Sequence, residues 1–341
     1  MSKYDASQIQ VLNGPESVRK RPGMFLGNID SLAANTVIYE LVANSVDRYL
    51  AGLASKVKLV LVDDVATVED DGDGLPFNER STVDGFSSLA ESFFMSLHNT
   101  ATKDGHAPHV HLKGGGLGLC VVNAVCEHVN VSSSINGKLY KQRFGKGKVI
   151  SDCLVDNSSP QKGTSVELTL DPEIFRETKF DPFDLRKTMF EVAHFYPGLV
   201  VEFQSERFYS EQGLLDLAYF YYQDPLGRMA KSNPIKFFFD GEINQVQLYV
   251  AAIGHASDDS ETRLLSWVNG AQTILGGVHE DGLRNAFSMA GWSPSIAIVH
   301  AVMHNPKYAG PTKDALAGAE VSEAITQLLE EPLSKIEVPN F

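Results

Sequence analysis

Three polar side chains recur at helical spacing in the otherwise apolar stretch from Thr36 to Leu50. Glu40, Asn44 and Asp47 stand at i, i+4 and i+7, so a helix would bring them onto one face. A buried carboxylate can act as a general base, and an amide oxygen can bind a divalent cation. Taken alone, the stripe is better explained as the solvated edge of a core helix. Its meaning depends on the motifs that follow.

A second motif, Asp70-x-Gly72-x-Gly74, comes where a predicted strand ends. An aspartate there can accept a hydrogen bond from an exocyclic amine such as adenine N6, and the glycines allow backbone to approach a flat ligand. Asp-Gly pairs are also typical of ordinary turns. The pattern therefore gains weight only from its neighbours.

A glycine run precedes an apolar helix that begins at Leu119. The run reads Lys113, Gly114, Gly115, Gly116, Leu117 and Gly118. Glycines before a helix expose backbone N–H groups that suit phosphates. The run is neither a Walker A sequence nor a dinucleotide fingerprint, and by itself it indicates a flexible loop.

Mixed helices and strands must position these motifs, and they predict an α+β fold. Helices are predicted at 36–50, 81–98, 119–126, 182–197, 214–222 and 320–332. Strands are predicted at 57–63 and 66–70, and again in VNVSSS, KLYKQRF, TSVELTL, LVVEFQ and RFYS. Composition shifts near Gln212, which predicts two domains, 1–212 and 213–341.

Composition places the chain among soluble globular proteins of the cytoplasm. Its 341 residues are 43% hydrophobic and 21% charged, the N-terminus is polar, and no apolar run has the length of a membrane span. Cys120, Cys126 and Cys153 have no metal or disulfide spacing. A net charge of −14 repels phosphate backbones, which disfavours autonomous DNA binding.

The order of these motifs, completed by Thr164 in KGTSVEL, resembles the Bergerat nucleotide fold of gyrase, Hsp90, histidine kinases and the mismatch-repair ATPase. The opening segment, Ile9 to Gly14 and then VRKRPGMF-x-G, narrows the resemblance to the ATPase fragment of the gyrase B and topoisomerase IV E subunits. Further matches lie in the helix after the lid and in the second half of the chain. They read Val121-Val122-Asn123-Ala124, Val268-Asn269, Gly276-Gly277-x-His279-x-x-Gly282-x-Arg284, Asn305-Pro306-Lys307-Tyr308 and Thr312-Lys313-Asp314.

This resemblance implies a Bergerat (GHKL) α/β sandwich followed by a ribosomal-S5-like transducer domain, with ATP and Mg²⁺ as cofactors. It makes Glu40 the general base and Asn44 the Mg²⁺ ligand, and it brings Lys313 to the γ-phosphate. It assigns adenine recognition to Asp70, with Gly72, Gly74, Pro76 and Thr164 around it. It assigns the phosphate lid to Lys113, Gly114, Gly115, Gly116, Leu117, Gly118 and Leu119.

The resemblance also implies an ATP-dependent homodimer, because Tyr4 in the N-terminal arm would reach the partner subunit's nucleotide. DNA or a gyrase-type partner subunit would be engaged only indirectly, and no membrane is involved. The chain departs from the family in several places. Asp73 and Ile135 replace two arginines, so we expect the charge network at the pocket mouth to be missing. Pro311 replaces a γ-phosphate donor, and the stretch between Arg284 and Ala297 is shorter than the family's, which predicts a shortened transducer.

Three functions fit these observations. The first is an ATP-gated dimer clamp of the gyrase type, without DNA cleavage of its own because neither a TOPRIM acidic cluster nor a breakage-reunion tyrosine domain is found. The second is a free-standing ATPase recruited to a non-topological task, such as a biosynthetic enzyme, a phosphotransferase or a gyrase-related resistance or defence protein. The third, a catalytically dead module, is disfavoured by Glu40.

Other patterns have simpler explanations. We interpret His98, His106, His109 and His111 as solvated histidines in a polar loop rather than as a metal site. We interpret the aromatic run from Tyr219 to Tyr222 as core and interface. The basic cluster from Arg19 to Arg21 is interpreted as a structural segment rather than as a nucleic-acid patch.

Overall fold

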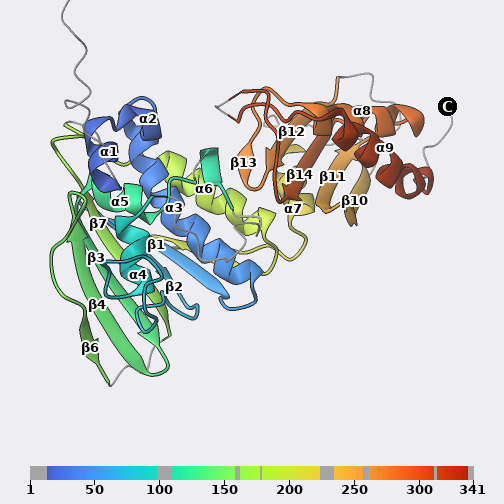
Figure 1. The fold of residues 1–341 in the computed structure, drawn as a ribbon. Coiled ribbons are helices and arrows are strands. Elements are labelled where there is room, and N and C mark those ends of the chain that lie inside the picture. Colours follow the sequence, from blue (N-terminus) through green and yellow to red (C-terminus); the bar gives the residue numbers. More distant parts are fainter. Residues whose placement is uncertain are drawn as a thin grey trace, which may run out of the picture. The chain divides into compact units, whose positions relative to one another are not determined.

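The computed structural model, shown in Figure 1, divides into two compact units. The first contains residues 1–103 and 117–185, and the second contains residues 104–116 and 186–341. The structure describes residues 14–97, 110–114, 116–157, 162–176, 179–222, 234–255, 261–310 and 313–336. Tyr4, Gly115, Pro311, Thr312 and the histidines at 98, 106 and 109 therefore lie outside the described residues. Each unit is described by itself below.

An antiparallel sheet forms the base of the first unit. Its strands lie in the order β5-β4-β3-β7-β2-β1, and β6 pairs with β4. Their bounds are β1 Lys56–Val62, β2 Val65–Asp70, β3 Cys126–Ile135, β4 Lys138–Gly145, β5 Lys148–Val149, β6 Leu154–Asp156 and β7 Gly163–Leu170. Alternate residues of β1 and β2, such as Leu59 and Val68, are buried, which is the period that a sheet with one covered face requires.

The helices of the first unit are α1 Pro15–Lys20, α2 Gly23–Leu26, α3 Ser31–Leu50, α4 Leu89–Met95 and α5 Leu119–Val125. Of these, α3 and α5 pack on the covered face of the sheet, and α1 and α4 pack against α5. The N-cap of α3 is Asp30, whose side chain accepts a hydrogen bond from the Ala33 N–H. The apolar side of α3 packs against β1 and β2, and α5 packs against β3. This packing holds the polar stripe of α3 beside the end of β2.

The opening basic cluster has a structural role in this unit. The Arg19 guanidinium donates to Asp171 Oδ2 at 2.6 Å and to the Ala124 carbonyl oxygen at 2.8 Å. The side chain of Asp171 is fully buried, and Lys146 lies 3.4 Å from its other oxygen. Burial alone would raise the pKa of Asp171, but the hydrogen bond and charge of Arg19 lower it below its usual range. Arg19 thus ties α1 to the end of α5, as the interpretation of this cluster as structural requires.

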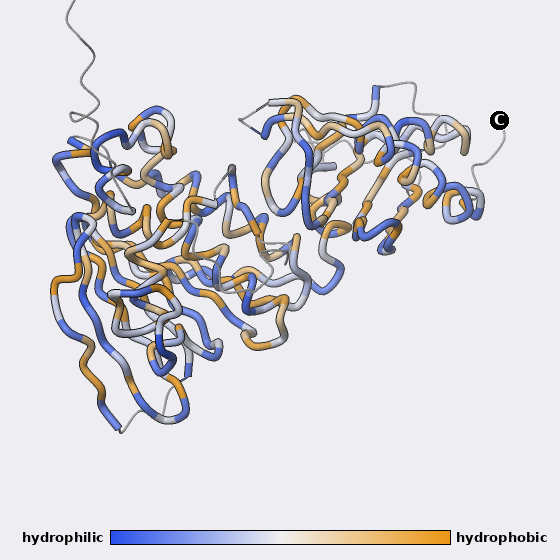
Figure 2. Tube along the Cα trace, viewed as in Figure 1, coloured by the Kyte–Doolittle hydropathy of each residue, from blue (hydrophilic) through white to orange (hydrophobic). Residues whose placement is uncertain are grey.

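The second unit has its own sheet and core. Its strands lie in the order β10-β11-β14-β12-β13, with β12 and β14 parallel. Their bounds are β10 Ile235–Ile243, β11 Val246–Gly254, β12 Arg263–Val268, β13 Ala271–Gln272 and β14 Ile296–Met303. The other elements are η2 Leu112–Gly114, α6 Pro182–Phe195 (which begins in the first unit), β8 Val200–Phe203, β9 Glu206–Phe208, α7 Leu214–Tyr222, α8 Val278–Met289 and α9 Ala319–Ser334. Hydrophobic residues fill the central strands β11 and β14, as Figure 2 shows.

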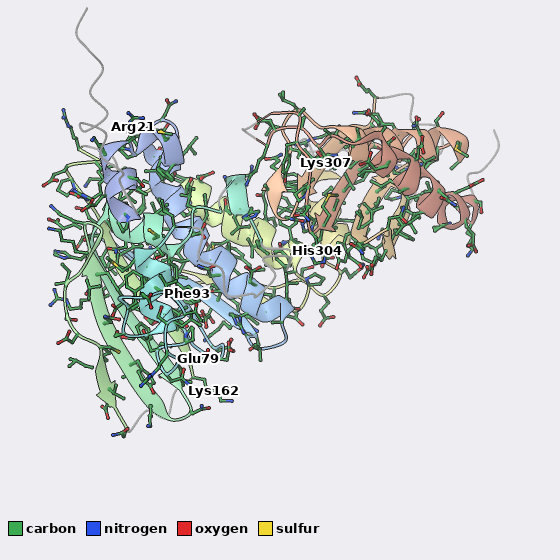
Figure 3. The ribbon with its side chains drawn as sticks, in the orientation of Figure 1. Arg21, Glu79, Phe93, Lys162, His304 and Lys307 are labelled. Carbon is green, nitrogen blue, oxygen red and sulfur yellow. The ribbon has the colours of Figure 1, made fainter. Side chains whose placement is uncertain are left out.

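These elements confirm the predicted α+β class, and the two largest differences in helix length lie in the first unit. The helix predicted at 36–50 begins five residues earlier, at Ser31, because Asp30 caps it. The helix predicted at 81–98 is only Leu89–Met95, where Ser88 caps the N-terminus and Phe93 (labelled in Figure 3) is buried. No helix among the described residues is both long and apolar enough to cross a membrane.

Candidate nucleotide site

A pocket opens in the first unit between α3 and the ends of β2 and β7. Its volume is about 60 Å³, or about 430 Å³ when the open mouth is included. The residues that line it are Leu41, Asn44, Ser45, Arg48, Val68, Asp70, Gly74, Leu75, Leu119, Thr164 and Val166. Apolar walls with a few convergent polar groups are typical of small-molecule sites. The pocket therefore collects several of the predicted site residues from four separate parts of the chain.

Asp70 is the most constrained polar group in this pocket. Its Oδ1 accepts hydrogen bonds from the backbone N–H of Gly72 at 2.9 Å and of Thr164 at 3.3 Å. Its Oδ2 accepts from the Ser45 hydroxyl at 3.1 Å. Burial raises the pKa of Asp70 above its usual value, and these three hydrogen bonds oppose the shift. The carboxylate is thus held in one orientation at the pocket wall, with acceptor capacity left for a ligand.

The turn after Asp70 requires glycine. Gly74 has a φ of 86°, and a Cβ there would lie 2.7 Å from Ser133 Oγ and 2.9 Å from a side-chain carbon of Ile135. The Ser133 hydroxyl also accepts a hydrogen bond from the Leu75 N–H at 2.8 Å. The turn is therefore pressed onto β3, where Gly74 and Leu75 form one wall of the pocket.

Pro76 connects the same turn to α4, and Thr164 connects it to β7. The Pro76 carbonyl oxygen accepts hydrogen bonds from Glu79 and Ala90, so it joins the turn to α4 and does not line the pocket. Thr164 pairs directly with Asp70 in the register of β2 and β7. Its backbone N–H donates a hydrogen bond to Asp70 Oδ1 at 3.3 Å.

Glu40 and Asn44 lie one turn apart on α3, as the helical spacing predicted. Asn44 lines the pocket, whereas Glu40 is buried, with only 7% of its surface exposed. Glu40 Oε2 accepts a hydrogen bond from the Leu117 N–H at 2.9 Å. The structure therefore brings the last residues of the glycine run, Leu117 to Leu119, next to the carboxylate and the amide.

The earlier part of the glycine run, up to Gly116, belongs to the second unit. Lys113 has a φ of 46° within η2, and the His111 N–H donates to the Asn269 carbonyl oxygen at 2.7 Å. Gly116 has a φ of 96° and lies against the His111 ring. The expected role of Lys113 and its glycines in covering phosphates stays a prediction.

Lys313 also belongs to the second unit. It has a φ of 60°, and its backbone N–H donates to the Gly310 carbonyl oxygen at 3.3 Å. Nearby, Lys307 (labelled in Figure 3) pairs with Glu320 at 3.4 Å. The reach of Lys313 to a γ-phosphate stays a prediction as well.

A magnesium ion would fit the first-unit pocket in the way nucleotide enzymes hold it. Mg²⁺ is usually bound through one or two protein oxygens, with phosphates and water completing the coordination. The Asn44 amide supplies such an oxygen at the pocket wall. No cluster of three or more metal-binding side chains occurs in the described part of the chain, so the nucleotide would have to supply most ligands.

Sequence reasoning missed two residues of this pocket, Ser45 and Arg48. Ser45 orients Asp70 from α3. Arg48 donates to both carboxylate oxygens of Asp73, at 2.8 and 3.0 Å. The two arginines of the family are replaced by Asp73 and Ile135, and Arg48 forms a different ion pair with Asp73 beside the pocket. The helical spacing 44, 48 could have pointed to Arg48, because residues four apart share a face.

Comparisons with known proteins agree with this geometry. Residues 29–174 match the family described as histidine kinase-, DNA gyrase B- and HSP90-like ATPases. The DNA gyrase B protein of Streptococcus pyogenes serotype M3 is 31% identical to this chain. The alignment covers the whole of this chain and 56% of the gyrase protein. The gyrase B protein of Thermotoga maritima is also 31% identical over 98% of the chain, which covers 57% of it. The chain thus spans little more than half the length of these relatives.

Solved structures show the same relationship. The 43K ATPase domain of Thermus thermophilus gyrase B, solved with an aminocoumarin, has a TM-score of 0.78 and 25% identity, covering 95% of this chain and 90% of that one. The gyrase B protein of Myxococcus xanthus, at 21% identity and a TM-score of 0.74 over 94% of this chain and 95% of that one, supports the fold alone. Residues 29–174 are therefore similar to GHKL-type ATPase domains, and the chain is similar to gyrase B over its whole length.

Proposed function

We propose that this chain hydrolyses ATP in a Mg²⁺-dependent reaction and that ATP binding closes a homodimeric clamp. The observation that carries the proposal is the convergence of Glu40, Asn44 and Asp70 around one pocket and its adjoining loop. A base, a metal-binding amide and an oriented acceptor for the adenine amine are the groups that ATP hydrolysis needs. The chain would not cleave DNA by itself, and the gyrase B relationship favours the cytoplasm.

Each group has a defined task in this proposal. Asp70 accepts a hydrogen bond from adenine N6, which fixes the base and therefore the direction of the phosphates. Mg²⁺, held by Asn44 and the phosphate oxygens, neutralises phosphate charge when it is bound. Glu40 orients the attacking water and takes its proton. Buried surroundings strengthen these polar interactions relative to water.

The second part of the proposal concerns coupling between ATP and assembly. The glycine run would close over the phosphates, Lys313 would reach the γ-phosphate from a domain comprising 213–341, and Tyr4 would act across the dimer. Binding energy would then draw these segments together, and hydrolysis would release them. This is a conformational cycle, so slow turnover is expected.

Net charge favours a second candidate, a related ATPase that serves a task other than DNA transport. The chain has 43 acidic and 29 basic residues, and a surface charge of −14 opposes contact with a phosphate backbone. The pocket chemistry is the same in both cases. Only the partner of the clamp differs.

Phosphate release and molecular size test the proposal together. We expect phosphate release from ATP that stops with EDTA and returns with Mg²⁺, and a shift from monomer to dimer with a non-hydrolysable ATP analogue. Stimulation by DNA supports the clamp of the gyrase type, and its absence supports the second candidate. Absence of ATP binding by calorimetry would overturn both candidate functions. A molecular size that is the same with and without the analogue would overturn the clamp.

A further inference from the structure

A second cavity lies wholly within the second unit and plays no part in the proposed ATP chemistry. It has a volume of about 250 Å³ and is bounded by the C-terminal half of α8, the start of β12 and the connection from α8 to β14. That connection belongs to the stretch between Arg284 and Ala297, which the sequence predicts to be shorter than in the family it resembles.

Two aromatic side chains form a rigid apolar wall of this cavity. Phe287 and Trp292 are 4% and 2% exposed, and their rings meet edge to face with centroids 5.6 Å apart and an interplanar angle of 86°. The backbone N–H of Trp292 donates to the Phe287 carbonyl oxygen at 3.1 Å, which fixes the two residues relative to each other. Leu264 completes the apolar lining. Such a wall favours a flat apolar group.

The buried indole of Trp292 carries a donor that the protein does not use. Its Nε1 has no hydrogen-bond partner among the described residues. An indole N–H can only donate, and a buried donor without an acceptor destabilises the fold. The nitrogen itself is buried, so this donor is an unsatisfied group within the wall and not part of the cavity surface.

The polar part of the lining consists of donors and hydroxyls. Arg284 supplies a positive charge, and its guanidinium has one long contact, 3.7 Å, with Glu280 Oε2. Glu280 does not line the cavity, and its other oxygen accepts a hydrogen bond from Ser266 at 2.6 Å. Hydroxyl groups come from Thr262, Ser288 and Ser293, and no acidic side chain is among the described residues that line the cavity. The lining therefore favours an anion over a cation.

We infer that this cavity binds a small aromatic carboxylate. The ring lies against Phe287 and Trp292, and the carboxylate pairs with Arg284. A volume of about 250 Å³ is large enough to hold a single aromatic ring. The site is independent of the ATP pocket, so it stands or falls separately from the proposed function.

Calorimetry of the whole chain with sodium benzoate tests this inference, with neutral benzamide as the matched probe. We expect saturable binding of benzoate that is at least roughly tenfold tighter than that of benzamide, since a hydrogen bond to a charged group is worth about one order of magnitude or more. Arg284→Met should weaken benzoate binding roughly tenfold. Arg207→Met removes an exposed arginine of the same unit and should leave binding unchanged.

Fluorescence provides a second readout that does not depend on heats of binding. The chain has two tryptophans, so Trp267→Phe leaves Trp292 as the only indole, and benzoate should then change its emission with the same affinity. Circular dichroism checks that each variant is folded. Absence of saturable benzoate binding to the unaltered chain overturns the inference. Equal affinities of the chain for benzoate and benzamide would also overturn it. An affinity of Arg284→Met for benzoate equal to that of the unaltered chain would do the same.

Discussion

Arg48 and Asp73 form a two-point ion pair at the pocket of the first unit, with Nε 2.8 Å from Oδ1 and Nη2 3.0 Å from Oδ2. Arg48 extends from α3, and Asp73 lies in the turn after β2. The pair therefore links the helix that carries Glu40 and Asn44 to the turn that carries Asp70. Its geometry is the parallel, forked one that guanidinium and carboxylate groups prefer.

Breaking this pair should cost little stability. The two side chains are 38% and 46% exposed, and ion pairs at such positions are worth only about 0–1 kcal/mol. We expect a double-mutant cycle with Arg48→Ala and Asp73→Ala to give a coupling of about 0.5 kcal/mol in urea unfolding, declining with salt. A coupling several times larger would show that the pair is part of the core.

Replacing Glu40 with glutamine should separate binding from hydrolysis. Glutamine keeps an oxygen that can accept the Leu117 N–H, but it cannot take a proton from water. We expect Glu40→Gln to bind ATP as the unaltered chain does and to lose roughly 100-fold or more in phosphate release.

Glu69→Gln is the matched control, because Glu69 lies on β2 with 45% of its side chain exposed. Its turnover should equal that of the unaltered chain. Unchanged turnover in Glu40→Gln would refute the assignment of the base.

Replacing Asp70 with asparagine should weaken ATP binding. The oxygens of Asp70 accept from two backbone N–H groups and a hydroxyl, so an amide NH₂ would face at least one donor. It would also remove acceptor capacity for the adenine amine. We expect a roughly tenfold or greater loss of affinity by calorimetry.

Asp71→Asn provides the comparison within the same turn. Asp71 accepts from the backbone N–H groups of Ser55 and Lys56 rather than facing the pocket. The affinity of a folded Asp71→Asn variant for ATP should be close to that of the unaltered chain. Equal affinities for Asp70→Asn and Asp71→Asn would contradict the adenine contact.

Two buried histidines should make the second unit sensitive to acid. Burial lowers the pKa of His279 to about 4 and that of His300 to about 3, so both are neutral in the folded chain above those values. The unfolded chain binds a proton at each histidine below about pH 6.5. Stability should therefore fall as the pH drops from 6.5 toward 4, by about 1.4 kcal/mol per pH unit for each histidine.

Urea unfolding at pH 7.5 and pH 5 measures this effect. In His300→Gln the difference between the two pH values should shrink, because only one of the two buried imidazoles remains. His304→Gln changes an exposed histidine of the same unit, labelled in Figure 3, and serves as the control. The same pH difference in His300→Gln and in the unaltered chain would refute the role of His300.

The elements that the sequence predicted well are those with a local signal. The alternation of β1 and β2 and the periodicity of α3 are visible in single segments, and so is the turn between them at Asp63. The first turns of α3 were missed because they contain mainly small and polar residues. Their signal is the Asp30 cap, which a search for apolar periodicity does not use.

In the pocket, motif residues were easier to predict than their partners. Asp70 and Gly74 stand in a recognisable pattern, whereas Ser45 and Arg48 interact with residues 25 positions further along the chain. The pairing of Arg48 with Asp73 depends on where the turn is pressed against β3. No pattern within either segment specifies that geometry.

The hydrogen bond from the Leu117 N–H to Glu40 joins the end of the glycine run to the middle of α3. The segment from Leu117 to Leu119 cannot move away from the pocket unless this bond breaks. For a chain in which Glu40 is the base, a change in the position of this segment therefore also changes the hydrogen bonds that the carboxylate can offer to a water.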